Sequence, residues 1–478
     1  MKVYHISAEC YPVAKVGGLG DVVGALPKYQ NRLGIDASVI MPWYDCAFVN
    51  ERCFISIFTG EIKIGTQIYD YHISKERDNV LGFSLYLVKI PGLLDRKDVY
   101  GYSDESIQFI AFQHALLHWL SASQPEPILL HCHDHHSGLI PFFIDYGEEF
   151  KSLRGMPTVG TVHNGQYQGW MGWDQAVLMP AFDWAHRGLL DWNGVINPLA
   201  ALIKCCWAYT TVSEGYLEEL FGKANGLEAL FASESQKSHG IVNGIDSEVW
   251  HPMKDALIKF AFDHTNLEGK RKNKMTFCKQ HGLTYRLPLF SFIGRLVHEK
   301  GADLLPAFIE AAIKAFPDQF NMMILGSGDA ETESKLIALS ERFAKNVVVT
   351  IGYDESLSHR IYASSDFLLM PSRVEPCGLN QLYAMQYGTM PIVRKTGGLA
   401  DTVVDISQDG YGISFENSTV SEMLEAMAQA VALYTRKNLL NQKRKLMMEQ
   451  DFSWESSADK YKSLYQSLWA DWEKLSKK

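Results

Sequence analysis

The sequence contains no dense block of Lys and Arg, and its formal net charge is −10 at pH 7. Nucleic acids and anionic membrane surfaces attract proteins through clustered positive charge, so both are disfavoured as partners. The chain also lacks an apolar run of the length that crosses a bilayer, and no charged-then-apolar segment precedes its first apolar run. We therefore expect a cytoplasmic protein that binds neither nucleic acid nor membrane.

Paired cysteines are missing as well. The eight cysteines are scattered without a Cys-x-x-Cys motif, and Cys205 and Cys206 are merely adjacent. This pattern is typical of reduced thiols rather than of a disulfide framework. The chain is rich in apolar residues instead: 47% of its 478 residues are hydrophobic and 21% are charged, which favours large cores over disorder. A chain of this length predicts two domains of roughly 200–250 residues.

Short apolar strands alternate with helical patterns along the first half of the chain. Residues 2–8 predict a buried strand, and residues 127–133 and 158–164 predict two more. Helical spacing of apolar residues appears from Asp21 to about Leu33 and at 105–121. This alternation predicts a parallel sheet covered by helices on both faces.

The pattern restarts in the second half. Turn residues and a Pro at 240–255 indicate a hinge between the two halves. The tail from Phe452 predicts two helices, with Trp and Tyr on one face, that pack onto a neighbouring domain. Strands are predicted in the second half at 288–295, 320–328, 346–353, 366–372 and 390–395.

Two glycine-rich strings match each other, "VAKVGGLGDVV" at 13–23 and "VRKTGGLADTV" at 393–403, with seven of eleven residues identical. In the first, Gly18 lies between a strand and a helix, where free N–H groups and the helix dipole suit a diphosphate. The spacing is neither G-x-G-x-x-G nor a Walker A motif. Asp21 is equally explained as an acid in the first helical turn. One such loop in each half predicts two doubly wound domains that face each other across a cleft.

The string "HCHDHHSG" at 131–138 is the strongest candidate for a metal site, because four histidines and an aspartate fall within six residues. In a continuous strand, however, His131, His133 and His135 point to one side and Asp134 points to the other. We therefore expect no metal here. A strand end that delivers polar side chains into a cleft is the preferred interpretation.

Three further strings place polar side chains after predicted strands. In 161–170, His163 begins a run of amides and rings that suits a polyhydroxylated ligand. Arg295 and Lys300 follow the first strand of the second half, where two cations can clamp a diphosphate; a solvated surface loop is the alternative. Glu375 precedes a helix predicted to open near Gly378; a capping role is the alternative for this carboxylate, while the free N–H groups of the helix can face the phosphate held by the Lys/Arg pair.

A set of motifs in fixed order carries a resemblance to a known family. They are "KVGGLGDVVGALPK", "HCHDHHSGL", "TVHNGQYQG", "NGID", "GRLVHEKG", "PSRVEPCGLNQLYAMQYGTMPIVRKTGGLADTV" and "FSWESSADKY". Over nearly the whole chain, the sequence resembles the bacterial glycogen synthase and plant starch synthase family. The resemblance implies an α/β chain with the GT-B fold: Rossmann-like domains at 1–250 (acceptor side) and 251–455 (nucleotide sugar), and a C-terminal helix at 456–478 that crosses back to the first.

The same resemblance implies the reaction. It is a retaining transfer of glucose from ADP-glucose to the non-reducing end of an α-1,4-glucan, without a cofactor or a metal. By position, His163 is expected near the transferred glucose, Arg295 and Lys300 on the leaving phosphates, and Glu375 as the acid of "E-P-C-G". The implied substrate contacts are Lys15, Gly18, Asp21, Asp134, Asn243, Tyr353, Gly378, Leu379, Asn380 and Gly398.

Three departures from the family pattern concern donor and acceptor contacts. The family usually has Thr where Asn380 stands and a Leu-Ala type pair at 165–166, and Tyr383 occupies the place of a second Glu found in many GT-B relatives. UDP-glucose as preferred donor and another GT-B α-glycosyltransferase activity therefore remain alternatives. A dinucleotide oxidoreductase, a metal-dependent hydrolase and a non-catalytic glucan-binding protein are the rival classes.

Overall fold

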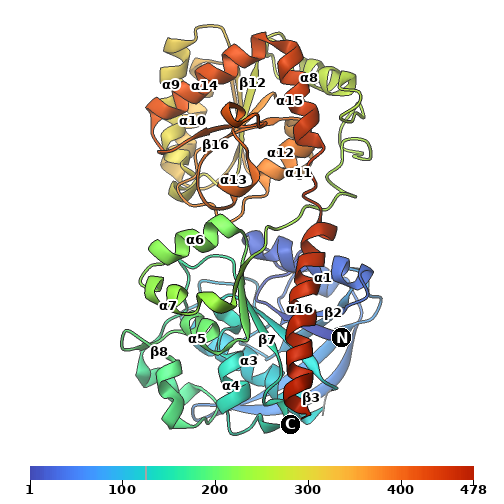
Figure 1. Ribbon diagram of the computed structural model, residues 1–478, viewed down its shortest axis with the longest axis vertical. Helices are drawn as coiled ribbons and strands as arrows, with labels where there is room; N and C mark the ends of the chain where they lie inside the picture. Colours follow the sequence, from blue (N-terminus) through green and yellow to red (C-terminus); the bar gives the residue numbers. More distant parts are fainter. Residues whose placement is uncertain (124–125, 478) are drawn as a thin grey trace. The chain divides into compact units, whose positions relative to one another are not determined.

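The computed structural model describes residues 1–123 and 126–477. The chain divides into two compact units (Figure 1). Unit 1 contains Met1–Val212, Leu217–Ile241 and the C-terminal segment from Trp454 onward, and unit 2 contains Ser213–Tyr216 and Val242–Ser453. Within the described residues, no helix combines the length and the apolar character that crossing a membrane requires.

The sheet of unit 1 has the strand order β11-β10-β7-β6-β1-β2-β5-β4-β3. Neighbours from β11 to β5 are parallel, whereas β4 is antiparallel to both β5 and β3. The chain moves from β1 to β2 on one side and later to β6 on the other, so the switch point lies between β1 and β6. The strands are β1 (Lys2–Ile6), β2 (Asp36–Pro42), β3 (Phe54–Ile64), β4 (Gln67–Glu76), β5 (Ser84–Lys89), β6 (Ile128–His133), β7 (Thr158–Val162), β10 (Ala208–Thr211) and β11 (Ser238–Gly240).

Unit 1 also contains a separate hairpin, in which β8 (Asp191–Trp192) pairs with β9 (Val195–Ile196). Its helices come from both ends of the chain. One of them, α6 (Glu214–Gly222), begins in unit 2 and ends in unit 1. The helices are α1 (Gly18–Arg32), α2 (Ala47–Asn50), α3 (Glu105–Ala122), α4 (Ile140–Tyr146), α5 (Pro198–Cys205), α7 (Glu228–Ser233) and α16 (Trp454–Ser476).

The last helix, α16, packs against α1 and the core of unit 1 (Figure 1). Trp454, Ala458, Tyr461 and Tyr465 are buried at helical spacing, which gives the helix one apolar stripe. The prediction of two helices in this tail is wrong: α16 is a single helix of 23 residues. Its sequence contains neither Gly nor Pro, so nothing interrupts the helix.

The sheet of unit 2 is parallel throughout, with the order β14-β13-β12-β15-β16-β17. In chain order this is 3-2-1-4-5-6, the Rossmann arrangement, with its switch point between β12 and β15. The strands are β12 (Leu289–Ile293), β13 (Asn321–Gly326), β14 (Val347–Ile351), β15 (Phe367–Met370), β16 (Met390–Arg394) and β17 (Ile413–Phe415).

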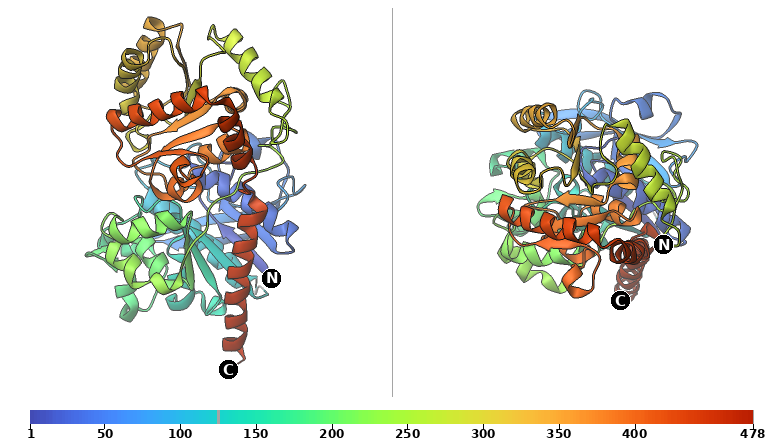
Figure 2. Two further views of the ribbon diagram at one scale, coloured as in Figure 1. Left: turned by 45° about the horizontal axis from the view of Figure 1, so that its top comes forward. Right: turned by 90° about the horizontal axis from the view of Figure 1, so that it is seen from above.

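Helices cover both faces of this sheet (Figure 2), and the buried side chains of the strands form the core of unit 2 beneath them. They follow the strands in the alternation that the sequence predicts. The helices are α8 (Glu268–Gln280), α9 (Leu305–Ala315), α10 (Ala330–Arg342), α11 (Glu355–Ser364), α12 (Asn380–Gln386), α13 (Gly397–Thr402), α14 (Val420–Thr435) and α15 (Lys437–Met448).

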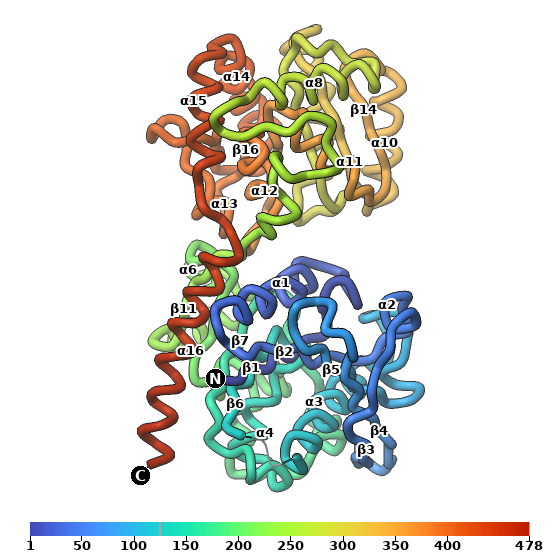
Figure 3. The backbone as a smooth tube through the Cα atoms, turned by 90° about the vertical axis from the view of Figure 1, so that its right-hand side faces the viewer, coloured from blue at the N-terminus to red at the C-terminus, as the bar shows by residue number. Residues whose placement is uncertain are grey.

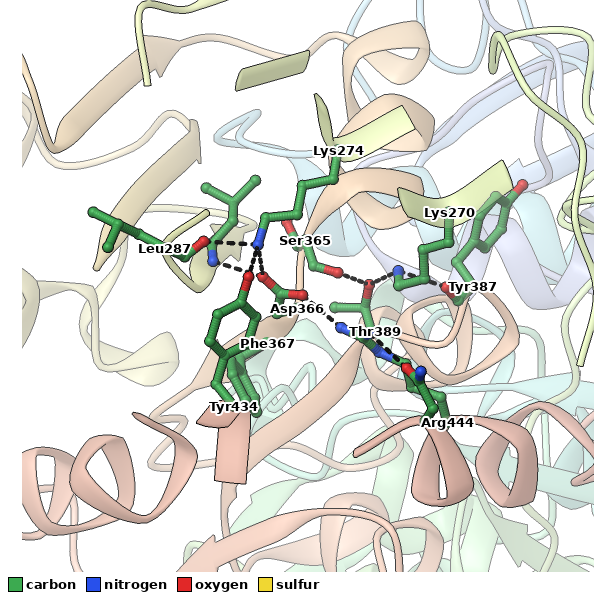
Figure 4. A network of polar contacts seen from close by, with 12 residues as sticks. Lys270, Lys274, Leu287, Ser365, Asp366, Phe367, Tyr387, Thr389, Tyr434 and Arg444 are labelled. Atoms are coloured by element: carbon green, nitrogen blue, oxygen red, sulfur yellow. Dashed lines mark hydrogen bonds and ion pairs between the residues drawn. The ribbon is translucent and has the colours of Figure 1, made fainter. Parts of the chain in front are cut away.

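A buried ion network lies at the amino end of β15 in unit 2 (Figure 4). The Asp366 carboxylate accepts from the Lys274 ammonium and the Arg444 guanidinium, each at 2.5 Å, and from the Leu289 N–H at 2.8 Å. Burial alone would raise the pKa of Asp366, but the charges of Lys274 and Arg444 outweigh it and hold the pKa at about 2. The network ties α8 and α15 to the edge of the sheet opposite the carboxyl ends of the strands.

Candidate active site

In unit 1, one buried carboxylate holds the glycine-rich loop in place. Glu9 is 3% exposed. Its Oε2 accepts the backbone N–H groups of Val16 at 2.6 Å and Gly17 at 3.0 Å, and its Oε1 accepts the Tyr100 hydroxyl at 2.7 Å. The sequence analysis missed Glu9, because a lone acid outside the glycine string has no distinguishing pattern.

The glycines of this loop lie at the start of α1. Among the described residues, apart from the chain neighbours and the helix's own backbone, no atom lies within 4 Å of a Cβ built on Gly17 or Gly18. The Lys15 ammonium pairs with the Asp21 carboxylate at 2.7 Å, and both side chains are partly exposed. The predicted residues Lys15, Gly18 and Asp21 thus share one loop, and Asp21 does more than occupy the first helical turn, since it holds Lys15.

Two predicted residues meet where β6 and β7 end. The Asp134 carboxylate accepts the backbone N–H of His163 at 2.7 Å. Asp134 has φ 55° and ψ −171°, a conformation that is costly for any residue with a side chain, and such strain concentrates at functional sites. Burial raises the pKa of Asp134 to about 7 and lowers that of His163 to about 3. His163 is therefore a neutral imidazole at physiological pH.

The histidines of β6 follow the predicted alternation only within the strand. The rings of His131 and His133 stack with centroids 4.3 Å apart. The strand ends at His133, as predicted, so the alternation of a continuous strand does not extend to His135, which begins a 3-10 turn. Nitrogens of His5, His131 and His133 lie within 4.8 Å of one another. Hydrogen bonds already engage both ring nitrogens of each, so a metal ion would have to displace them.

A pocket of about 180 Å³ opens beside this turn in unit 1. Its lining includes Glu105, Gln113, His135 and Trp170, and the Trp170 side chain is 67% exposed. An open indole ring next to a few polar groups suits a sugar, which has apolar faces and a rim of hydroxyls.

In unit 2, two oppositely charged residues predicted for the site meet directly. Lys300 follows β12 and Glu375 follows β15, the two strands at the switch point. The Lys300 ammonium donates to both Glu375 oxygens, at 2.6 and 2.7 Å, and the Ser372 hydroxyl donates to one of them at 3.0 Å. Glu375 is 4% exposed. Lys300 therefore belongs to a largely buried ion pair rather than to a solvated loop, whereas the Arg295 side chain is 57% exposed and lies 3.5 Å from Glu299.

The conformation of the chain after Glu375 depends on the glycine at 378 and on the side-chain amide of Asn380. Gly378 has φ 75°, and a Cβ there would lie 2.4 Å from an existing side chain, so the turn requires glycine. Leu379 directly precedes α12, and Asn380 Nδ2 donates to the Ile293 carbonyl at 2.6 Å. This bond connects the end of β12 to the start of α12.

Three predicted contacts lie elsewhere in unit 2. The Gly398 amide donates to two carbonyls of the Glu375 loop at 3.1 and 3.2 Å. Asn243 is 6% exposed, and its Oδ1 has no hydrogen-bond partner in the described part of the chain. Tyr353 follows the edge strand β14 and is 77% exposed. Lys300, Glu375 and Gly398 are therefore joined by hydrogen bonds through Glu375, whereas the Tyr353 side chain is exposed to solvent.

Comparisons with known proteins show the class of enzyme to which this chain belongs. Two family models match: the starch synthase catalytic domain over residues 2–233 and the glycosyl transferases group 1 over residues 274–466. The catalytic domain of starch synthase IV from Arabidopsis thaliana, solved with ADP and acarbose, superposes with a TM-score of 0.86 at 32% identity, covering 98% of this chain and 99% of that one. Sucrose-phosphate synthase from Thermosynechococcus elongatus shares the fold, with a TM-score of 0.63 at 17% identity over 98% and 99% of the chains. The chain is a glycosyltransferase with the GT-B fold.

Curated relatives identify the family more closely. The glycogen synthase of Flavobacterium johnsoniae is 49% identical over 466 residues, which is 97% of this chain and 98% of that protein. The glycogen synthase of Francisella tularensis is 35% identical over 495 residues, covering 98% and 99%. The chain belongs to the glycogen synthase and starch synthase family. The predicted family, fold class and transferase activity are confirmed, and the oxidoreductase, hydrolase and non-catalytic alternatives are set aside.

Proposed function

We propose that this enzyme transfers glucose from ADP-glucose to the non-reducing end of an α-1,4-glucan, with retention at the anomeric carbon and in the cytoplasm. The family supports the glucan product, and the ADP and acarbose in the starch synthase IV structure support the donor and acceptor classes. The observation in this chain that carries the proposal is the Lys300–Glu375 pair at the switch point of the Rossmann sheet. Nucleotide ligands bind at this point in doubly wound sheets.

Lys300 and Arg295 are proposed to bind the leaving diphosphate. The bond from the glucose anomeric carbon to the phosphate oxygen breaks, and a bond to the acceptor hydroxyl forms. The hydroxyl proton leaves with ADP, so the step balances without another reactant. Negative charge grows on the diphosphate as the first bond breaks, and cations already placed there stabilise the transition state more than the ground state. Arg295 is exposed enough to turn toward such a ligand.

Glu375 is proposed to keep Lys300 in position until the donor binds. Both carboxylate oxygens face the ammonium, and Ser372 fixes one of them. A buried charge pair with an additional hydrogen bond is well ordered, which suits a preorganised site. The Gly378–Leu379–Asn380 turn and Gly398 hold the backbone around this pair, Asn243 lies in the same unit, and Tyr353 is proposed to contact the adenine.

In unit 1, His163 is proposed to accept a hydrogen bond from the glucose being transferred. A neutral imidazole that binds a hydroxyl does not repel the positive charge that develops on the sugar in the transition state. Asp134 holds the His163 backbone. Lys15 and Gly18 are proposed for the donor phosphates, Asp21 is proposed as a further substrate contact that also holds Lys15, and the pocket beside Trp170 is proposed for the glucan.

A parallel assay of two donors tests the function. Radiolabelled glucose incorporation into glycogen is measured from ADP-glucose and from UDP-glucose, and the product is digested with an α-1,4-specific amylase. We expect a markedly higher kcat/KM with ADP-glucose and complete release of label by the amylase. A higher kcat/KM with UDP-glucose would overturn the donor assignment, and Asn380→Thr, which restores the residue usual in the family, is then the first variant to assay.

A further inference from the structure

A continuous chain of buried polar side chains runs from α16 to His163 within unit 1. Gln30 Nε2 donates to the Tyr465 hydroxyl at 3.1 Å, and Gln30 Oε1 lies 2.7 Å from His5 Nε2. His5 Nδ1 lies 3.0 Å from His133 Nε2, and His133 Nδ1 lies 2.9 Å from His163 Nε2. We call Tyr465, Gln30, His5, His133 and His163 the histidine relay. Its residues lie on α16, α1 and the neighbouring strands β1 and β6, and directly after β7; Figure 3 labels these elements.

The relay is closed to solvent along its length. Tyr465, Gln30, His5 and His133 are fully buried, and His163 is 8% exposed. Burial lowers the pKa of His5 to about 4 and that of His133 well below its ordinary value. Each imidazole is therefore neutral, with one N–H and one lone pair, and each hydrogen bond in the relay has a definite direction.

The direction follows from the amide oxygen of Gln30, which can only accept. His5 must donate to this oxygen from Nε2, so His5 Nδ1 carries no hydrogen and accepts a hydrogen bond. His133 must then donate to His5 Nδ1 from Nε2, so His133 Nδ1 is also an acceptor. His163 must in turn donate from Nε2, so its proton lies on Nε2 and its Nδ1 is the acceptor.

A second branch has the same polarity. Because Gln30 Nε2 donates to the Tyr465 oxygen, the Tyr465 hydrogen is available for His131 Nδ1 at 2.6 Å. His131 Nε2–H then points to the Thr161 hydroxyl at 2.5 Å, and the Thr161 hydroxyl lies 2.6 Å from that of Thr210. Turning the Gln30 amide over would reverse every bond in both branches together, so Tyr465 and Gln30 set the direction for the whole network.

We propose that Gln30 and Tyr465 are positioning residues for glycosyl transfer, because through the histidine relay they fix His163 as the tautomer with its proton on Nε2 and its acceptor on Nδ1. A glucose hydroxyl then meets a neutral acceptor of fixed orientation. This inference rests on the proposed function, which places His163 beside the transferred glucose. It goes further by assigning a role in the reaction to two residues that do not touch the substrate.

The test reads the tautomer directly. In protein labelled with ¹⁵N-histidine, long-range proton–nitrogen correlation at pH 7.5 shows which nitrogen of each ring carries the proton, and a His163→Asn variant assigns the His163 signals. We expect Nε2–H in the parental enzyme. We expect Gln30→Met, which removes both amide groups, to give a mixture of the two His163 tautomers. Tyr465→Phe should give the same mixture and remains available if Gln30→Met does not fold.

Kinetics connect the tautomer to the reaction. Gln30→Met and Tyr465→Phe should lower kcat in proportion to the Nε2–H tautomer that is lost, about twofold for an equal mixture, with little change in KM for glycogen. Tyr209→Phe is the matched control: this tyrosine is also fully buried in unit 1, but its hydroxyl donates to the Phe231 carbonyl outside the relay. It should leave the His163 tautomer and kcat unchanged.

Three results would overturn the inference: Nδ1–H on His163 in the parental enzyme, a single unchanged tautomer in both relay variants, or a mixed tautomer with parental kcat. The first two are visible in protein without substrate. They are therefore distinct from a failure of the proposed function, which shows as no glucose incorporation by the parental enzyme.

Discussion

The two glycine-rich strings, 13–23 and 393–403, share seven of eleven residues but lie in opposite surroundings. In unit 1, a Cβ on Gly18 would meet nothing within 4 Å among the described residues. The matching residue in unit 2 is Gly398, where a Cβ would lie 2.2 Å from the Cys377 carbonyl oxygen. The first loop is open at Gly17 and Gly18 and is held by Glu9. The second is packed against the backbone of the Glu375 loop.

Similar strings therefore provide similar local structure and different roles. In both units the string leads from a loop into a helix, α1 in unit 1 and α13 in unit 2. In unit 1, glycine leaves room at the start of that helix, where a ligand can approach. In unit 2, glycine lets two backbone segments approach each other closely. The sequence match alone cannot separate these two uses, because both require the absence of a side chain.

The buried polar networks of the two units also differ in role: one leads to the candidate site and the other does not. Unit 1 buries neutral histidines that lead to His163, a residue of the candidate site. Unit 2 buries the ions Lys274, Asp366 and Arg444 at the amino end of β15, away from the carboxyl end that carries Glu375. We infer that the first network serves the reaction and the second serves stability. The following predictions test that division, from the largest expected effect to the smallest.

Mild acid should destabilise unit 1 before unit 2. Burial lowers the pKa of His5 and His135 to about 4 and that of His163 to about 3. Unfolded histidine titrates near pH 6.5, so each contributes stability that is lost as pH falls below 6.5, by up to about 1.4 kcal/mol per pH unit. Asp134 opposes this trend: its pKa is raised to about 7, so its contribution is present below about pH 4 and lost as pH rises to 7. Asp366 has a pKa of about 2, so its contribution is lost only below about pH 4.

Hydrogen exchange measured by mass spectrometry at pH 7.5 and pH 5, corrected for intrinsic rates, checks this prediction. Peptides of unit 1 should lose protection at pH 5 while those of unit 2 keep theirs. Earlier loss of protection in unit 2 would contradict it.

Asp366→Asn should destabilise the enzyme by about 3–5 kcal/mol, because Lys274 and Arg444 are left buried without an opposite charge. Its kcat per folded molecule should stay parental, since the network lies at the amino end of the strand. Urea unfolding and active-site-normalised kinetics measure the two quantities. The control is Asp303→Asn, which breaks a partly exposed pair with Arg373 and should cost less than about 1 kcal/mol. A large fall in kcat for Asp366→Asn would contradict the division.

Gly398→Ala should destabilise the enzyme by about 1–3 kcal/mol and lower kcat, because the new methyl group must push the Glu375 loop away. Gly18→Ala is the matched substitution in the first string and should change stability by less than about 0.5 kcal/mol. The urea unfolding midpoints of the two variants, measured side by side, compare the two losses of stability. Equal losses of stability would show that the two loops are not packed differently.

Glu9→Gln should cost about 1 kcal/mol, because a neutral amide oxygen replaces a charged acceptor of two backbone N–H groups. The KM for the donor should rise as the glycine loop loosens. Glu228 offers a matched control, since its Oε1 accepts the N–H groups of Ala224 and Gly226 in a more exposed setting. Glu228→Gln should have a smaller effect on stability and none on the donor KM; the opposite ranking would remove Glu9 from the site.

The sequence predicts the parts of this molecule that depend on local pattern. Alternating apolar strands and helices predict the doubly wound sheets, and the polar residues after strands include His163, Lys300 and Glu375. Partners brought together only by the fold were missed. Glu9 contacts the glycine loop, and Tyr465 contacts Gln30 from the far end of the chain, through contacts that no spacing indicates.

The same limit explains the prediction of two helices in the C-terminal tail, which was wrong. The uninterrupted helix α16 depends on its packing against unit 1, which periodicity alone does not define.

The most direct test of the account is the kcat of Lys300→Ala, measured per folded molecule with saturating ADP-glucose and glycogen. Lys300→Arg and the double variant Lys300→Ala with Glu375→Gln, which removes the unpaired buried charge, control for misplaced charge. The account predicts a fall of roughly 10²–10³ in kcat for Lys300→Ala, about 3–4 kcal/mol, with a smaller rise in donor KM, partial recovery in Lys300→Arg and no recovery in the double variant. A near-parental kcat in Lys300→Ala would contradict the role of Lys300 on the leaving diphosphate.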